Sequence, residues 1–194
     1  RRLLGRVARR AATAEAMPYY KGNHHAVIGD HDEIGRPAYT HRLDIEPELA
    51  FVVGTPGQPV AGYLVFNDGS ARDVQLPEMI GTGPNRSKDF AHSKGLGPWL
   101  VTPDEVPDPL GLRVTVEVNG RPRWTGHTRE YVRHPEEVAA FLATITQWPP
   151  GTVVGMGTVP DCTGLDHGDW LEPGDAIAIT IEGLGTLHQR LPAY

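Results

Sequence analysis

The chain has 194 residues, of which 39% are hydrophobic, enough to bury one substantial core and too few to require two. Its 18 Lys and Arg against 24 Asp and Glu give a net charge of −6, which argues against a general nucleic-acid binder. No apolar run approaches the length of a membrane span. The single cysteine, Cys162, cannot form an intrachain disulfide, so we expect a cytoplasmic protein in which Cys162 is a spectator.

The N-terminal segment, residues 1–17, is strongly basic. Five arginines occur in its first ten residues, and an Ala-rich stretch follows as far as Met17. This pattern predicts a short basic helix or an inter-subunit arm, the remnant of a longer N-terminal region. The arginines interrupt the apolar residues, so we predict no secretory signal. Residues 18–194 are expected to form the main domain.

From Pro18 onward the sequence predicts short strands separated by turns, because the chain contains 23 Gly and 18 Pro. The clearest predicted hairpin covers residues 112–124, where Asn119-Gly120 suits a tight type I′ turn. A second hairpin is predicted over residues 176–191. One helix is predicted over residues 134–146, with Pro135 near its start. We therefore predict a mainly β fold with one or two short helices.

Three carboxylates lie beside the apolar strands. Glu46 and Glu48, two residues apart at the start of the apolar run 49–53, would share one face of a strand, and Asp68 follows a second apolar run. Like charges held beside a hydrophobic strand are unfavourable unless a cation lies between them. Oxygen ligands suit Mg²⁺, with Mn²⁺ or Ca²⁺ as alternatives. Spacing alone favours the other interpretation, that these are ordinary surface acids.

Six short segments, in the same order along the chain, resemble the fumarylacetoacetate hydrolase family. They are LDIEPELA at 43–50, FNDGSARD at 66–73, KDF at 88–90, GPWLVT at 97–102, GT at 157–158, and LEPGD to EGLG within 171–185. The likeness runs from about Pro18 to Leu191. It implies a mixed β-sandwich rolled around a metal site, with Glu46, Glu48 and Asp68 as the metal ligands.

The resemblance also assigns catalytic and substrate-binding residues. The family's conserved lysine falls on Lys88, and its Gly-Thr pair near the substrate falls on Gly157 and Thr158. Lys88 would offset the negative charge of the carboxylates and hold a substrate carboxylate or enolate oxygen. Taken in isolation, Lys88 would be read as a solvated loop lysine. Thr158 and the backbone N–H groups beside it would bind an anion, or Gly157 would merely serve a turn.

Residues 18–23 are similar to the family's pocket-lining stretch, so Tyr20, Lys21 and Asn23 are expected to donate hydrogen bonds to substrate oxygens. A Tyr in such a strand is more often a core residue with its hydroxyl at the rim.

The site also needs a group that carries protons. Family members that cleave or decarboxylate usually carry a His and a partner Glu upstream of the pocket stretch, and residues 1–17 contain no His. His92, just after Lys88, is the best visible candidate for the proton carrier, and His24 is a second candidate. The other interpretation of His92 is an exposed loop histidine without a catalytic role. Four histidines near the N-terminus fit no structural zinc spacing, so no histidine-bound metal is predicted. They are His24, His25, His31 and His41.

We predict a Mg²⁺-dependent enzyme that acts on small keto acids or 1,3-dicarbonyl compounds through an enolate. The resemblance favours C–C hydrolysis, because this reaction is frequent in the family. Decarboxylation and isomerisation are alternatives, and a non-catalytic metal-binding relative is a further one, favoured by the missing upstream His. The resemblance implies a homodimer, with the hairpin around Asn119 as a contact. No nucleic-acid or membrane partner is expected. The connection over residues 53–62 is shorter than the helical excursion of most relatives.

Overall fold

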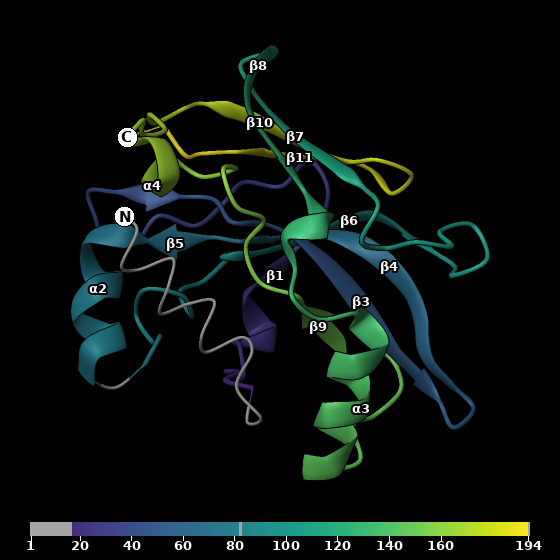
Figure 1. The fold of residues 1–194 in the computed structure, drawn as a ribbon. Coiled ribbons are helices and arrows are strands. Elements are labelled where there is room, and N and C mark those ends of the chain that lie inside the picture. The colour runs from purple at the N-terminus through teal and green to yellow at the C-terminus, as the bar shows by residue number, and fades with distance from the viewer. Residues whose placement is uncertain (1–16, 82, 194) are drawn as a thin grey trace.

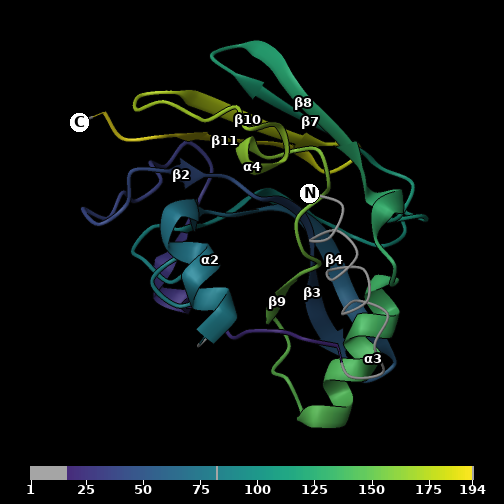
Figure 2. The same ribbon diagram turned by 60° about the vertical axis from the view of Figure 1, so that its left-hand side comes forward.

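The computed structural model describes residues 17–81 and 83–193, so the predicted basic helix or arm lies outside the described residues except for Met17. Strands dominate this part of the chain (Figures 1 and 2). They form a five-stranded sheet in the order β1-β6-β4-β3-β9, a four-stranded sheet in the order β11-β10-β7-β8, and the pair β2-β5. The strands of the five-stranded sheet and the pair are β1 (Val27–Ile28), β2 (Leu43–Asp44), β3 (Pro47–Thr55), β4 (Gln58–Asp68), β5 (Ser70–Ala71), β6 (Lys94–Val101) and β9 (Val153–Gly155).

The centre of the five-stranded sheet is the antiparallel hairpin of β3 and β4. Its register pairs Pro47 with Asn67 at the open end and Thr55 with Gln58 at the turn. The connection over residues 53–62 is therefore the closed end of a continuous hairpin, and Gly57 adopts φ +94° in its turn. On the outer side of β4, β6 pairs Lys94 with Asp68. The mixed character of the sheet comes from β1, which runs parallel to β6.

The four-stranded sheet confirms both predicted hairpins. The first consists of β7 (Arg113–Val118) and β8 (Arg121–His127), with positive φ at Asn119 and Gly120, as a type I′ turn requires. The second consists of β10 (Ala176–Ile181) and β11 (Gly185–Arg190). Alternate residues of β10 are buried, so one face of this sheet packs inward.

Three α-helices lie among the described residues, one more than the upper limit of the sequence prediction. The predicted helix is present as α3 (Pro135–Ile145), and the N–H of His134 donates to the Glu137 carboxylate at its start, 2.8 Å away. The helix α2 (Arg72–Gly81) was missed because Pro77 interrupts its pattern. The third is the single turn α4 (Gly164–His167). Two 3-10 turns complete the elements, η1 (His24–Ala26) and η2 (Thr128–Glu130).

One hydrophobic core lies between the two larger sheets. The four-stranded sheet contributes its inward β7 and β10 side chains, and the five-stranded sheet contributes residues such as Leu49, Phe51 and Val65, which are fully buried. β11 connects the sheets, since it contacts β6 and β4 as well as its partner β10. The mainly β, rolled-sandwich prediction is thus confirmed. Among the described helices, none has the length and apolar character needed to cross a membrane.

Candidate metal centre

The three predicted metal ligands come together at the open end of the β3–β4 hairpin. Glu48 is the second residue of β3, Asp68 is the last residue of β4, and Glu46 lies just before β3. The N–H of Asp68 donates to the carbonyl of Glu46 over 3.0 Å, which continues the ladder beyond β3. The carboxylates offer one oxygen each within 4.8 Å of one another, and all three residues are buried. These are not ordinary surface acids.

Lys88 reaches into this cluster from the segment after α2. Its Nζ donates to Glu46 Oε2 over 2.6 Å and lies 2.8 Å from Asp68 Oδ2. Lys88 is only 4% exposed, so it is not a solvated loop lysine. Burial opposes its charge, but the carboxylates of Glu46 and Asp68 outweigh burial and raise the pKa of Lys88. Lys88 is therefore a fixed positive charge beside two of the three acids.

Sequence analysis missed a second buried lysine, Lys94. Its ammonium contacts Asp68 Oδ1 and donates to the carbonyl of Lys88 over 2.7 Å and to the hydroxyl of Tyr20 over 2.8 Å. The Tyr20 hydroxyl in turn donates to both Asp68 oxygens, at 3.2 and 3.1 Å. Burial and then the Asp68 charge raise the pKa of Tyr20, so its hydroxyl keeps its proton. Tyr20 thus contacts the Asp68 carboxylate, and its role as a substrate donor stays a prediction.

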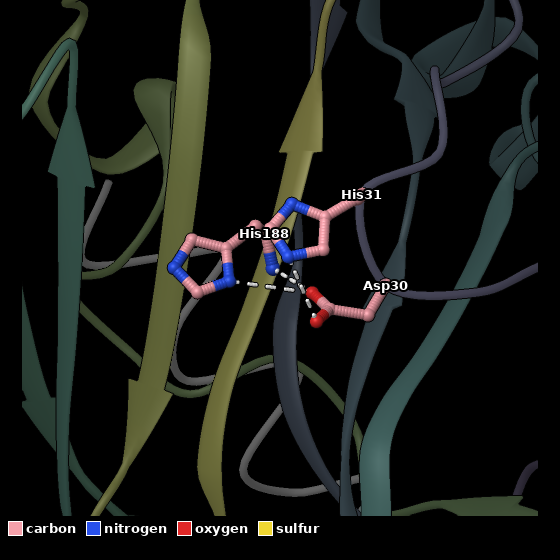
Figure 3. Close-up of side chains that lie close together, drawn as sticks. All are labelled: Asp30, His31 and His188. Carbon is pink, nitrogen blue, oxygen red and sulfur yellow. Dashed lines mark hydrogen bonds and ion pairs between the residues drawn. The ribbon is translucent and has the colours of Figure 1, made fainter.

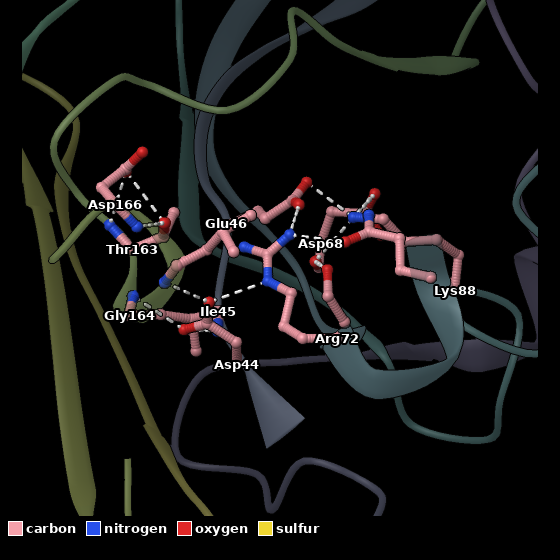
Figure 4. Close-up of polar contacts among 12 residues, drawn as sticks. Asp44, Ile45, Glu46, Asp68, Arg72, Lys88, Thr163, Gly164 and Asp166 are labelled. Atoms are coloured by element: carbon pink, nitrogen blue, oxygen red, sulfur yellow. Dashed lines mark hydrogen bonds and ion pairs between the residues drawn. The ribbon is translucent and has the colours of Figure 1, made fainter. Parts of the chain in front are cut away.

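Arg72, the first residue of α2, connects the cluster to Asp44 (Figure 4). Its guanidinium contacts Glu46 Oε1 and donates to Asp44 Oδ2 over 2.8 Å. Asp44 also accepts the backbone N–H groups of Gly164 and Leu165, at 3.0 and 3.1 Å. The N-terminus of α4 therefore orients Asp44, and Asp44 orients Arg72 toward Glu46. Neither Asp44 nor Arg72 was assigned a role from sequence, although both lie within the matched motifs.

The segment after β9 closes the other side of the cluster. The N–H of Gly157 donates to Glu48 Oε2 over 2.9 Å, and the Thr158 side chain hydrogen-bonds Glu46. The hydroxyl of half-buried Tyr131 donates to the carbonyl of Gly157 over 2.7 Å and accepts from the N–H of Leu49 over 3.1 Å. Gly157 and Thr158 thus contact the predicted metal ligands, and Tyr131 holds Gly157 against β3.

Glu46 and Glu48 have opposite electrostatic environments. Burial disfavours ionisation of Glu46, but Lys88 and Arg72 more than compensate and lower its pKa. Burial, followed by the charges of Asp68 and Glu46, raises the pKa of Glu48 well above its usual value. Among the described residues, no Lys or Arg nitrogen lies within ion-pair distance of Glu48. A Cβ at Gly155 would collide with Glu48 Oε2, so this glycine leaves the carboxylate its place.

These features test whether the residues fit a divalent cation. Three carboxylate oxygens converge, and Glu48 has an excess of neighbouring negative charge that a dication between the acids would remove. An all-oxygen donor set suits Mg²⁺, Mn²⁺ or Ca²⁺. The donor set therefore fits such an ion.

The other predicted site residues lie farther from the carboxylates. Asn23 donates its N–H to Asp89 Oδ1 over 2.9 Å and caps η1 by accepting from the N–H of His25. The ammonium of Lys21 lies over the Trp148 ring, 5.4 Å from its centroid. Asn23 is thus tied to the residue after Lys88, and Lys21 to the segment after α3. Their roles as substrate donors stay predictions.

His92 occupies an exposed turn just before β6. Its backbone is left-handed, with φ +59°, and its carbonyl accepts from the N–H of Gly35 over 3.0 Å. The ring is exposed, as is that of the substitute candidate His24. A role of His92 in proton transfer stays a prediction.

The described residues thus form a rolled β-domain in which three carboxylates converge beside two buried lysines. Residues 2–192 match the family described as fumarylacetoacetate (FAA) hydrolase, C-terminal. A presumed hydrolase from Burkholderia multivorans is 35% identical over 171 residues, which cover 82% of this chain and 60% of the relative. The chain therefore belongs to the fumarylacetoacetate hydrolase family. It spans 60% of the length of that relative.

Solved structures agree with this membership. Fumarylpyruvate hydrolase from Pseudomonas aeruginosa, in complex with Mn²⁺ and pyruvate, has a TM-score of 0.75 and 26% identity over 88% of this chain and 76% of that one. A 2-keto-3-deoxy-D-arabinonate dehydratase, complexed with magnesium and 2,5-dioxopentanoate, has a TM-score of 0.78 and 28% identity over 96% of this chain and 66% of that one. The fold thus accompanies more than one reaction.

Proposed function

We propose that this protein is a Mg²⁺-dependent enzyme that acts on a small keto acid or 1,3-dicarbonyl compound, with hydrolysis of a carbon–carbon bond as the leading reaction. The observation that carries the proposal is the convergence of Glu46, Glu48 and Asp68 within 4.8 Å of one another, away from solvent. Relatives of known structure that bind Mn²⁺ or magnesium together with small oxo compounds support it. In this proposal the three carboxylates hold the ion.

The charge of the buried cluster supports an anionic substrate. Its acids are Asp44, Glu46, Glu48 and Asp68, and its bases are Arg72, Lys88 and Lys94. With all seven ionised the sum is 3 − 4 = −1, and a dication changes it to +1. Uncompensated charge is unfavourable in a buried site, so a ligand group with a single negative charge would bring the cluster to neutrality. The carboxylate of a keto acid, or its enolate oxygen, has this charge.

The chain's own residues then have distinct tasks. A divalent cation at this centre would supply Lewis-acid polarisation of a substrate carbonyl. Lys88 stays positive and would stabilise negative charge that develops on a substrate oxygen. Arg72 holds one oxygen of Glu46, so that the carboxylate keeps its orientation. Thr158 and the N–H groups near it would position the far end of the substrate.

The reaction type depends on the proton carrier. Hydrolysis needs an activated water, decarboxylation needs no such water, and isomerisation needs a proton shuttle. The three reactions form different products, so product analysis separates them. His92 is the proposed carrier within this chain. The non-catalytic alternative predicts metal binding without turnover.

The experiment is a substrate panel of acylpyruvates, other diketo acids and oxaloacetate, assayed with Mg²⁺ and with chelator. We expect Mg²⁺-dependent turnover that Glu46→Ala abolishes and that Glu117→Ala, a change on the outer side of the four-stranded sheet, leaves intact. Near-ultraviolet circular dichroism would check that both variants are folded. Turnover that survives in chelator, or in Glu46→Ala, would refute the proposal.

The homodimer and the cytoplasmic location also stay predictions. Sedimentation analysis at micromolar concentration tests the first, and cell fractionation tests the second. A stable monomer would contradict the proposed dimer contact around Asn119.

A further inference from the structure

A second group of metal-ligand side chains lies on the surface, where residues 30–31 meet β11. Asp30, His31 and His188 each offer a ligand atom within 4.8 Å of the others (Figure 3). His31 Nε2 lies 3.4 Å from Asp30 Oδ2, and His188 Nδ1 lies 3.3 Å from Asp30 Oδ1. Both imidazoles therefore direct a nitrogen at the same carboxylate. The sequence did not predict this group because His188 is distant from the N-terminal histidines.

The backbone fixes the three side chains relative to one another. The N–H of His31 donates to the carbonyl of His188 over 2.7 Å, and the N–H of His188 donates to Asp30 Oδ1 over 2.6 Å. His31 adopts a left-handed backbone, φ +66°, which is uncommon for a residue other than glycine. The two rings stack, with centroids 4.8 Å apart and planes 1° from parallel. The arrangement is thus a part of the fold and not a chance approach of two surface histidines.

The donor set differs from that of the acidic centre, which consists of Glu46, Glu48 and Asp68. Two imidazoles and one carboxylate suit Zn²⁺, Ni²⁺ or Co²⁺, whereas three carboxylates suit Mg²⁺ or Mn²⁺. A metal ion binds an imidazole through the nitrogen lone pair of its neutral form. The group borders a surface depression of about 400 Å³, which Glu117 and Arg190 also line. Solvent therefore has access to coordination positions that the protein leaves open.

We propose that Asp30, His31 and His188 form a second metal site, which binds a divalent transition metal. The site is separate from the acidic centre, because successive residues of a strand point to opposite faces. His188 is exposed, whereas its neighbour Gln189 is buried and accepts a hydrogen bond from Asn67 Nδ2 over 2.7 Å. Asn67 in turn accepts the N–H of Glu46. A metal at the surface site would brace the strand that lies behind the acidic centre.

The test is a Zn²⁺ titration of the protein, free of any histidine tag, in excess Mg²⁺ so that the acidic centre is occupied. Imidazole ¹⁵N resonances are recorded by NMR. We expect the ring signals of His31 and His188 to shift together and saturate at one equivalent, while the signal of exposed His41 stays in place. Thermal unfolding is recorded in parallel, and Zn²⁺ is expected to raise the Tm.

Three variants make the test specific. His188→Gln should abolish the Zn²⁺-dependent shift of His31 and the rise in Tm. His31→Asn, which keeps a residue that tolerates positive φ, should abolish the Zn²⁺-dependent shift of His188 and the rise in Tm without disturbing the turn. The control, His41→Ala, should bind as the wild type does. The proposal is overturned if the two rings do not shift in the wild type, or if either cluster variant binds Zn²⁺ as the wild type does.

Discussion

Replacement of Glu48 by Gln should have opposite effects on stability with and without a divalent cation. In chelator at neutral pH, the buried Glu48 carboxylate is disfavoured by burial and by the charges of Asp68 and Glu46, which raise its pKa. Its folded pKa lies above its unfolded value, so its ionisation progressively destabilises the folded protein as pH rises through that interval. The amide of Gln carries no charge, and its oxygen can still accept the N–H of Gly157.

The magnitudes follow from this difference. Each pKa unit between the folded and unfolded states is worth about 1.4 kcal/mol, so Glu48→Gln should stabilise the cation-free protein by at least about 1 kcal/mol. A ligand at one hundred times its Kd stabilises a folded protein by about 2.7 kcal/mol. Mg²⁺ at that concentration should raise the free energy of unfolding of the wild type by about 2.7 kcal/mol. The same Mg²⁺ should stabilise the variant much less, because the variant has lost one anionic ligand. The order of stability therefore reverses when Mg²⁺ is added.

Urea unfolding followed by tryptophan fluorescence measures both states, because Trp124 is almost fully buried. The matched control is Glu117→Gln, which should respond to Mg²⁺ as the wild type does. The reasoning is refuted if Glu48→Gln is less stable than the wild type in chelator. It is also refuted if the variant gains as much stability from Mg²⁺ as the wild type.

Three further predictions concern the surroundings of the centre. Tyr131→Phe leaves the N–H of buried Leu49 without its partner and should lower the free energy of unfolding by about 1–3 kcal/mol, measured in urea; an unchanged midpoint would contradict the role of the hydroxyl. Burial raises the pKa of Cys162 to about 12, so a thiol reagent at pH 8 should label it only after unfolding, and rapid labelling of the native protein would be the contrary result. Burial opposes ionisation of Asp73, but hydrogen bonds from the N–H of His41 and the hydroxyl of Thr40 lower the pKa of Asp73 below 3.8. The Asp73 carboxylate therefore stabilises the folded protein above about pH 4, and this stabilisation is lost as the pH falls further. Asp73→Asn should flatten the acid limb of the stability curve, and an identical acid limb would rule out this contribution.

The sequence was sufficient for the two predicted hairpins and for the two strands that carry the three acids. Turn chemistry at Asn119-Gly120 fixed one hairpin, and the apolar runs before Asp68 and after Glu48 predicted the strands that carry the centre. Both signals are local, since the residues involved are neighbours in the chain. The helix α2 was hidden because Pro77 removes a backbone donor from its interior, and the contacts around it compensate only in the folded protein.

Of the cations around the acids, only Lys88 was expected, and the family resemblance rather than a local pattern indicated it. Nothing in the segment 88–94 indicates that both of its lysines turn inward, because this depends on the β4–β6 register that pairs Asp68 with Lys94. Tyr131 reaches Leu49 across 82 positions of sequence, which no local pattern indicates. Long-range pairing decides which charged residues are buried, and the sequence alone states only that they exist.

The separation of these contacts along the chain has a consequence for biosynthesis. The hydrogen bond between Gly157 and Glu48 spans 109 positions, and that between Asn67 and Gln189 spans 122. During synthesis, Glu48 and Asn67 leave the ribosome long before Gly157 and Gln189, their hydrogen-bond partners. Until then the surroundings of the carboxylates are incomplete. An ion held by the three carboxylates of the acidic centre would therefore be enclosed only after the segments around Gly157 and Gln189 have been synthesised.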